Sequence, residues 1–91
     1  MPYTVKEFHQ TPNPNALKCI LDRVIREREL GPASYRTAAA AGEDPVAAAL
    51  FKVAGVTNLL INEDWITVNK DPKAEWKAVK AGVSKALAGL G

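Results

Sequence analysis

The stretch from residue 44 to residue 70 constrains the fold most, because it predicts one helix followed directly by two strands. Asp44 and Pro45 are typical of a helix start, since Asp can cap the free N–H groups of the first turn and Pro fits the first helical position. Gly55 predicts the end of this helix, because Gly adopts a left-handed conformation without steric cost. The apolar residues between them recur at the spacing of one helical face: Val46, Ala49, Leu50 and Val53.

Two strands joined by a short turn are expected next. Residues 56–61 are rich in aliphatic side chains, and residues 65–70 alternate around β-branched ones. Residues 62–64 are Asn, Glu and Asp, which favour a turn.

The register of this hairpin decides which side chains are buried. A two-residue turn pairs Ile61 with Ile66 and Leu59 with Val68, so that all four side chains share one face. A three-residue turn would instead place Asn58 opposite Val68. We therefore expect the two-residue turn.

The N-terminal half predicts three further strands. They cover residues 3–8, residues 17–21 with Cys19 directed inward, and residues 33–36 with Tyr35 packed. Phe8 breaks the alternation of the first strand, because it falls on the opposite parity from the other apolar residues. Thr37 and the alanines that follow it predict one capped helical turn before Asp44.

The last helix has the clearest period. Asp71 is expected to cap it, with Pro72 at the first position and Glu75 in the first turn. Gly82 either weakens this helix or marks close packing on the sheet. One apolar stripe runs along it: Trp76, Val79, Val83, Ala86, Leu87 and Leu90.

The predicted order is β-β-β-α-β-β-α, which favours an α+β fold with a mainly antiparallel sheet and two helices packed on one face. The length of 91 residues favours a single domain over residues 1–91. A net charge of +2 argues against nucleic-acid binding, and no apolar run is long enough to span a membrane. The single cysteine and the absence of a signal-peptide pattern lead us to expect a cytoplasmic protein.

The chain offers few residues for metal binding or catalysis. A zinc site needs about four ligands and an iron–sulfur cluster about four thiolates. Cys19 and His9 are the only Cys and His, and there is no C-x-x-C pair. We expect Cys19 to be a core residue, with a thiol ligand shared across a dimer as the weaker alternative. Cys19 and His9 could form a catalytic pair only if their strands place them together. We predict no resident cofactor, no metal site and no enzyme activity.

The loop between the first two strands is the strongest candidate for binding a partner. Its two prolines fix φ, and its asparagines can bond the nearby backbone, so the loop should be stiff. A purely structural role for the loop is the alternative. Trp65 at the hairpin tip is a further candidate, since Trp is frequent at interface hot spots. The candidate residues are Thr11, Pro12, Asn13, Pro14, Asn15 and Trp65.

Residues 22–30 are the most polar part of the chain. Val24 and Ile25 could extend a strand there. The mixed charges favour a solvated edge, with an anion-binding patch as the alternative. Such a patch would use Arg23, Arg26 and Arg28.

The TPNPNALK sequence at residues 11–18 resembles the opening signature of the N-terminal domain of Nfu/NifU-type iron–sulfur scaffold proteins. Further matches are DPVA at 44–47, LF at 50–51, GV at 55–56, DWITV at 64–68 and the Trp76 helix. The resemblance covers nearly the whole chain in the same order. Cys19 replaces an aromatic residue that is common in the family, and residues 22–30 lack the usual Gly and Pro.

The resemblance implies a domain that stands alone, because full-length Nfu proteins carry their cluster-binding C-x-x-C pair in a separate C-terminal domain. It implies a non-catalytic accessory module of iron–sulfur cluster assembly or delivery, which acts by binding a protein. We expect the domain to be monomeric. The partner would be a scaffold, a carrier with the C-x-x-C domain or a recipient apoprotein. The alternatives are weak metal binding through Cys19 in a dimer and a small anion-binding domain.

Overall fold

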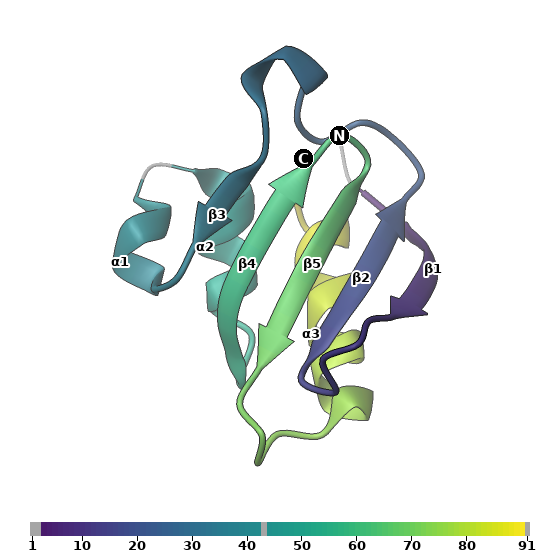
Figure 1. Cartoon of the computed structure of the whole chain (residues 1–91), viewed down its shortest axis with the longest axis vertical. Coiled ribbons are helices and arrows are strands. Elements are labelled where there is room, and N and C mark those ends of the chain that lie inside the picture. The colour runs from purple at the N-terminus through teal and green to yellow at the C-terminus, as the bar shows by residue number, and fades with distance from the viewer. Residues whose placement is uncertain (1–2, 43, 91) are drawn as a thin grey trace.

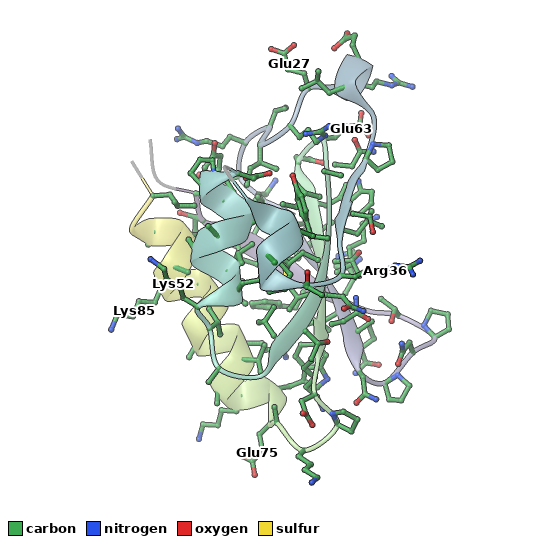
Figure 2. All side chains as sticks on the ribbon, turned by 90° about the vertical axis from the view of Figure 1, so that its left-hand side faces the viewer. Glu27, Arg36, Lys52, Glu63, Glu75 and Lys85 are labelled. Atoms are coloured by element: carbon green, nitrogen blue, oxygen red, sulfur yellow. The ribbon has the colours of Figure 1, made fainter. Side chains whose placement is uncertain are left out.

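The computed structural model describes residues 3–42 and 44–90 as a five-stranded sheet with helices on one face (Figures 1 and 2). All neighbouring strands pair antiparallel, in the order β1-β2-β5-β4-β3. The α+β class and the predicted strand and helix order are confirmed. The strands are β1 Val5–Gln10, β2 Ala16–Leu21, β3 Ala33–Tyr35, β4 Val56–Asn62 and β5 Trp65–Lys70. The helices are α1 Ala38–Ala41, α2 Pro45–Phe51 and α3 Trp76–Ala88, with a 3-10 turn at Arg28–Leu30.

The core lies between the sheet and helices α2 and α3. Cys19 points inward from β2 and is only 1% exposed, as predicted. The fully buried side chains come from three central strands and the two long helices, and burying one of their Leu or Ile side chains contributes about 1.5–3 kcal/mol. They include Leu21, Leu50, Leu59, Ile66, Val68, Val79, Val83 and Leu87.

The β4–β5 hairpin has the predicted register. Ile61 pairs with Ile66 and Leu59 with Val68, and all four side chains are buried. Glu63 in the two-residue turn adopts φ 44°, the left-handed conformation that such a tight hairpin requires. The parity of the apolar residues was therefore sufficient to set this part of the sheet.

Helix α2 begins as predicted but ends earlier. One carboxylate oxygen of Asp44 accepts the N–H groups of Val46 (3.0 Å) and Ala47 (3.2 Å). The helix ends at Phe51, so the prediction that Gly55 ends it is wrong. Gly55 instead has φ 93° in the turn into β4, where a Cβ would lie 2.7 Å from that of Ala74.

The buried face of α2 also differs from the prediction. Ala47 and Leu50 are fully buried under the sheet, whereas Val46, Ala49 and Val53 are only partly buried. A helix of seven residues packs against both the sheet and α3, so its predicted stripe is divided between two neighbours.

Helix α3 begins at Trp76, so the predicted start at Asp71 and Pro72 is wrong. Asp71 instead closes a turn, in which its side chain accepts the N–H of Lys73 (2.9 Å) and its carbonyl accepts that of Ala74 (2.9 Å). This turn carries the chain from the end of β5 to the helix layer.

Strand β1 runs to Gln10 and contains a register shift between Val5 and Glu7. The shift brings Val5 and Phe8 to the same partly buried face, which explains the broken alternation. The predicted strand extension at Val24 and Ile25 is wrong. Val24 is 61% exposed, and the N–H of Ile25 bonds the carbonyl of Glu63 (2.7 Å) in a loop.

Two long-range contacts complete the packing. A Cβ on Gly82 would lie 2.5 Å from a methyl group of Val53, so α3 passes very close to the chain that follows α2. The close packing at Gly82 is therefore against this segment and not against the sheet. The N–H of Tyr3 donates to the carbonyl of Leu87 (3.1 Å), which fixes the start of the described chain to the end of α3.

Candidate partner-binding site

The loop between β1 and β2 is held by its own side chains. The Thr11 hydroxyl accepts the N–H of Asn13 (3.2 Å) and lies 3.0 Å from the carbonyl oxygen of Ala16. The side-chain oxygen of Asn13 accepts the N–H of Asn15 (2.9 Å). The predicted bonds between the loop's side chains and its own backbone are therefore confirmed.

Two residues distant in sequence anchor the same loop to the body of the domain. The backbone N–H and the ammonium group of Lys70 donate to the backbone and side-chain oxygens of Asn15 (2.8 and 3.2 Å). The indole N–H of Trp76 donates to the carbonyl of Pro14 (3.0 Å). Lys70 is only 9% exposed, and its ammonium group lies 5.5 Å from the Trp76 ring centroid. The loop is thus fixed from both sides.

A pocket of about 410 Å³ lies between this loop, the end of β1 and the first half of α3. Pro12 and Pro14 form the loop side, and Leu17 contributes from β2. Trp76 and Lys80 line the helix side, one helical turn apart. A pocket of this volume, whose walls combine polar and apolar groups, has the size range of small-ligand and side-chain sites.

Lys80 is the only charged residue among the described residues that line the pocket. Its ammonium group lies 5.1 Å from the Phe8 ring centroid, where the negative face of the ring stabilises the cation. Within the part of the chain that the structure describes, no carboxylate lines the pocket. The pocket is therefore suited to a negatively charged group that lies next to Lys80.

Trp65 does not join this site. It begins β5 at the hairpin end of the sheet, whereas the loop lies beside Lys70 at the other end of the same strand (Figure 1). Trp65 is half-buried on the face of the sheet that α2 and α3 leave open, opposite Ile20, with the Lys18 ammonium 4.6 Å from its ring centroid.

Cys19 is an inert core thiol. Burial raises its pKa to about 12, and the smaller effect of the Lys80 charge acts in the opposite direction. The thiol is therefore protonated at neutral pH, whereas metal ligation requires the thiolate. This placement opposes the hypothesis of a Cys19 ligand shared across a dimer, because the core would have to open.

His9 and Cys19 lie on neighbouring strands but on opposite faces of the sheet. Phe8 pairs with Cys19, and His9 pairs with Lys18. His9 is exposed, and its Nε2 lies 2.9 Å from a carboxylate oxygen of Glu7. A nucleophile–base pair of Cys19 and His9 is therefore not formed.

Each of the three arginines of residues 22–30 has an acceptor within the domain. Arg26 bonds the carbonyl groups of Gly31 and Leu30 and so holds its own loop. The side chain of Arg28 is 85% exposed and lies 3.8 Å from a carboxylate oxygen of Glu63. The guanidinium of Arg23 lies 3.8 Å from a carboxylate oxygen of Asp22.

Sequence reasoning missed Phe8, Trp76 and Lys80 as part of this site. Trp76 was assigned to the core, and it does pack partly against it. Its indole N–H was the available signal, since a partly buried Trp usually places this donor on an acceptor. The acceptor, Pro14, lies 62 residues earlier in the chain, which no local pattern reveals.

Within residues 3–42 and 44–90, no three His, Cys, Asp or Glu side chains lie together as a metal-binding group. None of the helices in these residues is long and apolar enough to cross a membrane.

Solved structures share this fold. The NMR structure of a NifU-like protein from Saccharomyces cerevisiae aligns with a TM-score of 0.80 and 24% identity, covering 93% of this chain and 76% of that one. The crystal structure of protein SAV1430 from Staphylococcus aureus aligns with a TM-score of 0.74 and 23% identity, covering 91% and 96%. At these identities the likeness shows the fold alone.

Sequence relatives identify the family. The human "NFU1 iron-sulfur cluster scaffold homolog, mitochondrial" is 33% identical over 82 residues, which are 89% of this chain and 32% of that protein. A NifU-like protein of Schizosaccharomyces pombe is 32% identical over 74 residues, 81% of this chain and 28% of that protein. The chain thus spans about a third of the length of these relatives. The sequence model of the family described as "Scaffold protein Nfu/NifU N terminal" matches residues 5–90, and the chain therefore belongs to this family.

Proposed function

We propose that this domain is a non-catalytic interaction module that serves iron–sulfur cluster assembly or delivery by binding a protein. The proposal is supported by membership of the Nfu/NifU N-terminal family and by relatives whose names describe them as iron–sulfur cluster scaffold proteins. The partner would be a scaffold, a carrier with a C-x-x-C domain or a recipient apoprotein.

The chemistry of the side chains supports a role through a partner. An iron–sulfur cluster is normally held by about four thiolates. The chain contains one cysteine, and its thiol is buried and protonated. In this proposal the cluster is cargo, held by another protein.

The pocket beside the Thr11–Asn15 loop is the proposed contact site, and the hydrogen bonds that hold this loop are the observation that carries the proposal. A loop already fixed by Asn13, Lys70 and Trp76 loses little conformational entropy when a partner binds. Thr11, Asn13 and Asn15 hold the loop, while Pro12 and Pro14 present its surface to the pocket. Lys80 would bind a carboxylate of the partner, and Pro12, Pro14 and Trp76 would contact the adjacent side chain.

Pocket variants that leave the loop intact test this proposal. Lys80→Glu reverses the single charge of the pocket, and Gln10→Trp places a bulky ring at its edge. Lys77→Glu makes the same charge change at an exposed position of α3 outside the pocket, so it is the matched control. The binding partner in the assay is a separately expressed C-x-x-C domain of an Nfu protein, with and without its cluster, and the readout is calorimetry.

We expect both pocket variants to weaken binding at least about tenfold, as is common for residues central to an interface, while Lys77→Glu binds like wild type. Unchanged binding by both pocket variants would remove the pocket from the proposal. An Asn13→Ala/Asn15→Ala variant separates structure from contact. If it loses stability while its folded fraction binds normally, the asparagines have the structural role alone.

The monomeric state and the cytoplasmic location stay predictions. Sedimentation of the purified domain tests the first. For the second, the printed names of the human and Drosophila relatives describe those proteins as mitochondrial. Fluorescence microscopy of the tagged chain in its own cell tests the location directly.

A further inference from the structure

A second concave surface lies on the helix layer, between α2 and the second half of α3. This groove has a volume of about 450 Å³. Its apolar lining is only partly buried, so it is open to a partner. Ala49 and Val53 contribute from α2 and the residues after it, and Ala86 and Leu90 contribute from α3 and its end. None of these residues belongs to the pocket beside the Thr11–Asn15 loop.

Two lysines border the groove, one from each helix. Lys52 follows the last residue of α2, and Lys85 lies in the last turn of α3. Both are exposed, and Figure 2 shows both side chains projecting outward from the helix layer. Among the described residues, no carboxylate lines the groove, and neither lysine forms an ion pair. Cations near helix ends also stabilise the helix dipole, but this effect does not account for the apolar surface between them.

The backbone around the groove restricts the form of its occupant. Helices use their N–H and C=O groups internally, so the groove offers no row of backbone partners to an added strand. An occupant on an apolar surface has to satisfy its own backbone. A helix does this, and it presents apolar side chains along one face at the same time.

A second copy of this chain is a poor occupant. In a two-fold contact the same surface meets itself, so Lys52 and Lys85 of both copies would lie close together. Such like charges oppose association. We propose that the groove binds an amphipathic helix of a partner protein, whose apolar face is bordered by acidic residues. This proposal is independent of the pocket beside the Thr11–Asn15 loop.

A pair of synthetic peptides tests the charge and the form of the occupant together. One peptide is a helical 14-mer with leucines on one face and glutamates at the borders of that face. The other has lysine at each glutamate position. Binding is followed by fluorescence anisotropy of the labelled peptides and by amide chemical shifts of the ¹⁵N-labelled domain. We expect only the glutamate peptide to bind, with shifts at residues 49–53 and 82–90.

Charge reversal locates the contact. Lys52→Glu combined with Lys85→Glu should weaken binding of the glutamate peptide about tenfold and gain binding of the lysine peptide. Lys77→Glu, on an exposed part of α3 outside the groove, should change neither by more than about twofold. Melting curves of each variant separate any loss of helix stability from a loss of contact.

Four results would overturn the proposal. They are the absence of binding by the glutamate peptide, equal binding by both peptides, shifts outside the groove, and full binding by the double charge reversal. Sedimentation provides a further check. A complex between the wild-type domain and the double charge reversal, where neither forms a dimer alone, would show that the groove is an interface between copies of this chain.

Discussion

Each of the two tryptophans of this domain has a lysine ammonium group over its ring, but the two side chains have different structural roles. Near one end of the sheet, the Lys70 ammonium group lies 5.5 Å from the centroid of the Trp76 ring, and the indole N–H of Trp76 donates to the carbonyl of Pro14. At the other end, the Lys18 ammonium group lies 4.6 Å from the centroid of the Trp65 ring, on the face of the sheet that the helices leave open. Trp76 joins three segments of the chain, whereas Trp65 covers its own strand neighbours.

This difference shows that the surroundings of an aromatic residue, more than its type, decide its role. Trp65 attracted attention as an interface residue because it lies at a hairpin. Trp76 lies in an apolar stripe and was assigned to the core. The contacts give Trp76 the additional role, since its ring lines a pocket and its N–H fixes the wall of that pocket.

Truncation of each ring is the strongest test of this comparison. Trp76→Ala should lower the free energy of unfolding by about 3 kcal/mol, at the low end for a Trp because the ring is only partly buried. Trp65→Ala should cost about 1 kcal/mol, the upper range for a cross-strand pair. Urea unfolding followed by circular dichroism measures both. Equal losses in the free energy of unfolding would mean that the two tryptophans contribute equally to stability. Trp76→Phe isolates the hydrogen bond to Pro14, which should contribute about 1 kcal/mol.

A pH series tests the burial of Cys19 in β2, the strand that runs between these two ends of the sheet. Cys19 has its pKa raised by burial to about 12 from 9.0, so its thiol ionises first in the unfolded chain. The stabilisation is complete below pH 9 and is lost as the pH rises towards 12. Relative to Cys19→Ala, the wild-type protein should lose about 2 kcal/mol between pH 9 and 10.5.

The measurement is urea unfolding of both proteins at each pH, so that the titration of other groups cancels in the difference. A constant difference across this range would show that the thiol is accessible in the folded state. In that case the structure around Cys19 opens without unfolding of the whole domain.

Removal of one loop side chain should give a smaller effect. Asn13→Ala leaves the N–H of Asn15 without its acceptor, and the loss should be about 1 kcal/mol. Hydrogen exchange at the Asn15 amide should become faster, while exchange at Leu59 in the core should follow only the change in global stability. Unchanged exchange at Asn15 would show that the backbone and Trp76 hold the loop without this side chain.

The smallest effect is expected at the hairpin end. Arg28→Ala removes an exposed guanidinium that lies 3.8 Å from a Glu63 carboxylate oxygen, and it should change the stability by less than about 0.5 kcal/mol. Thermal melting at low and high salt measures it. A loss as large as that of Asn13→Ala would indicate that the charged segment is as well fixed as the Thr11–Asn15 loop.

Local patterns were sufficient wherever a short stretch determined its own geometry. The parity of Ile61 and Ile66 set the hairpin register, Asp44 capped α2, and the Asn13 side chain accepts a backbone N–H of the first loop. The odd parity of Phe8 was a correct signal of the irregularity in β1. In each case the interacting groups are close in sequence.

Patterns failed where distant segments decide the outcome. Helix α3 begins at Trp76, later than predicted, because residues 71–74 are needed to cross from the sheet to the helices. The pocket depends on a contact between Trp76 and Pro14, and the groove depends on the approach of α3 to Val53. Helical periodicity shows which side of a helix is apolar but not which segment covers it.

The bond between the Tyr3 amide and the Leu87 carbonyl, 3.1 Å long, has a consequence for how this unit can be combined with others. Because the first and last described elements meet, another protein could carry the unit as an insertion within a single surface loop, without stretching its own backbone. For the same reason, a short linker could close the chain on itself and allow new termini at an exposed turn, giving a circular permutant with the same sheet.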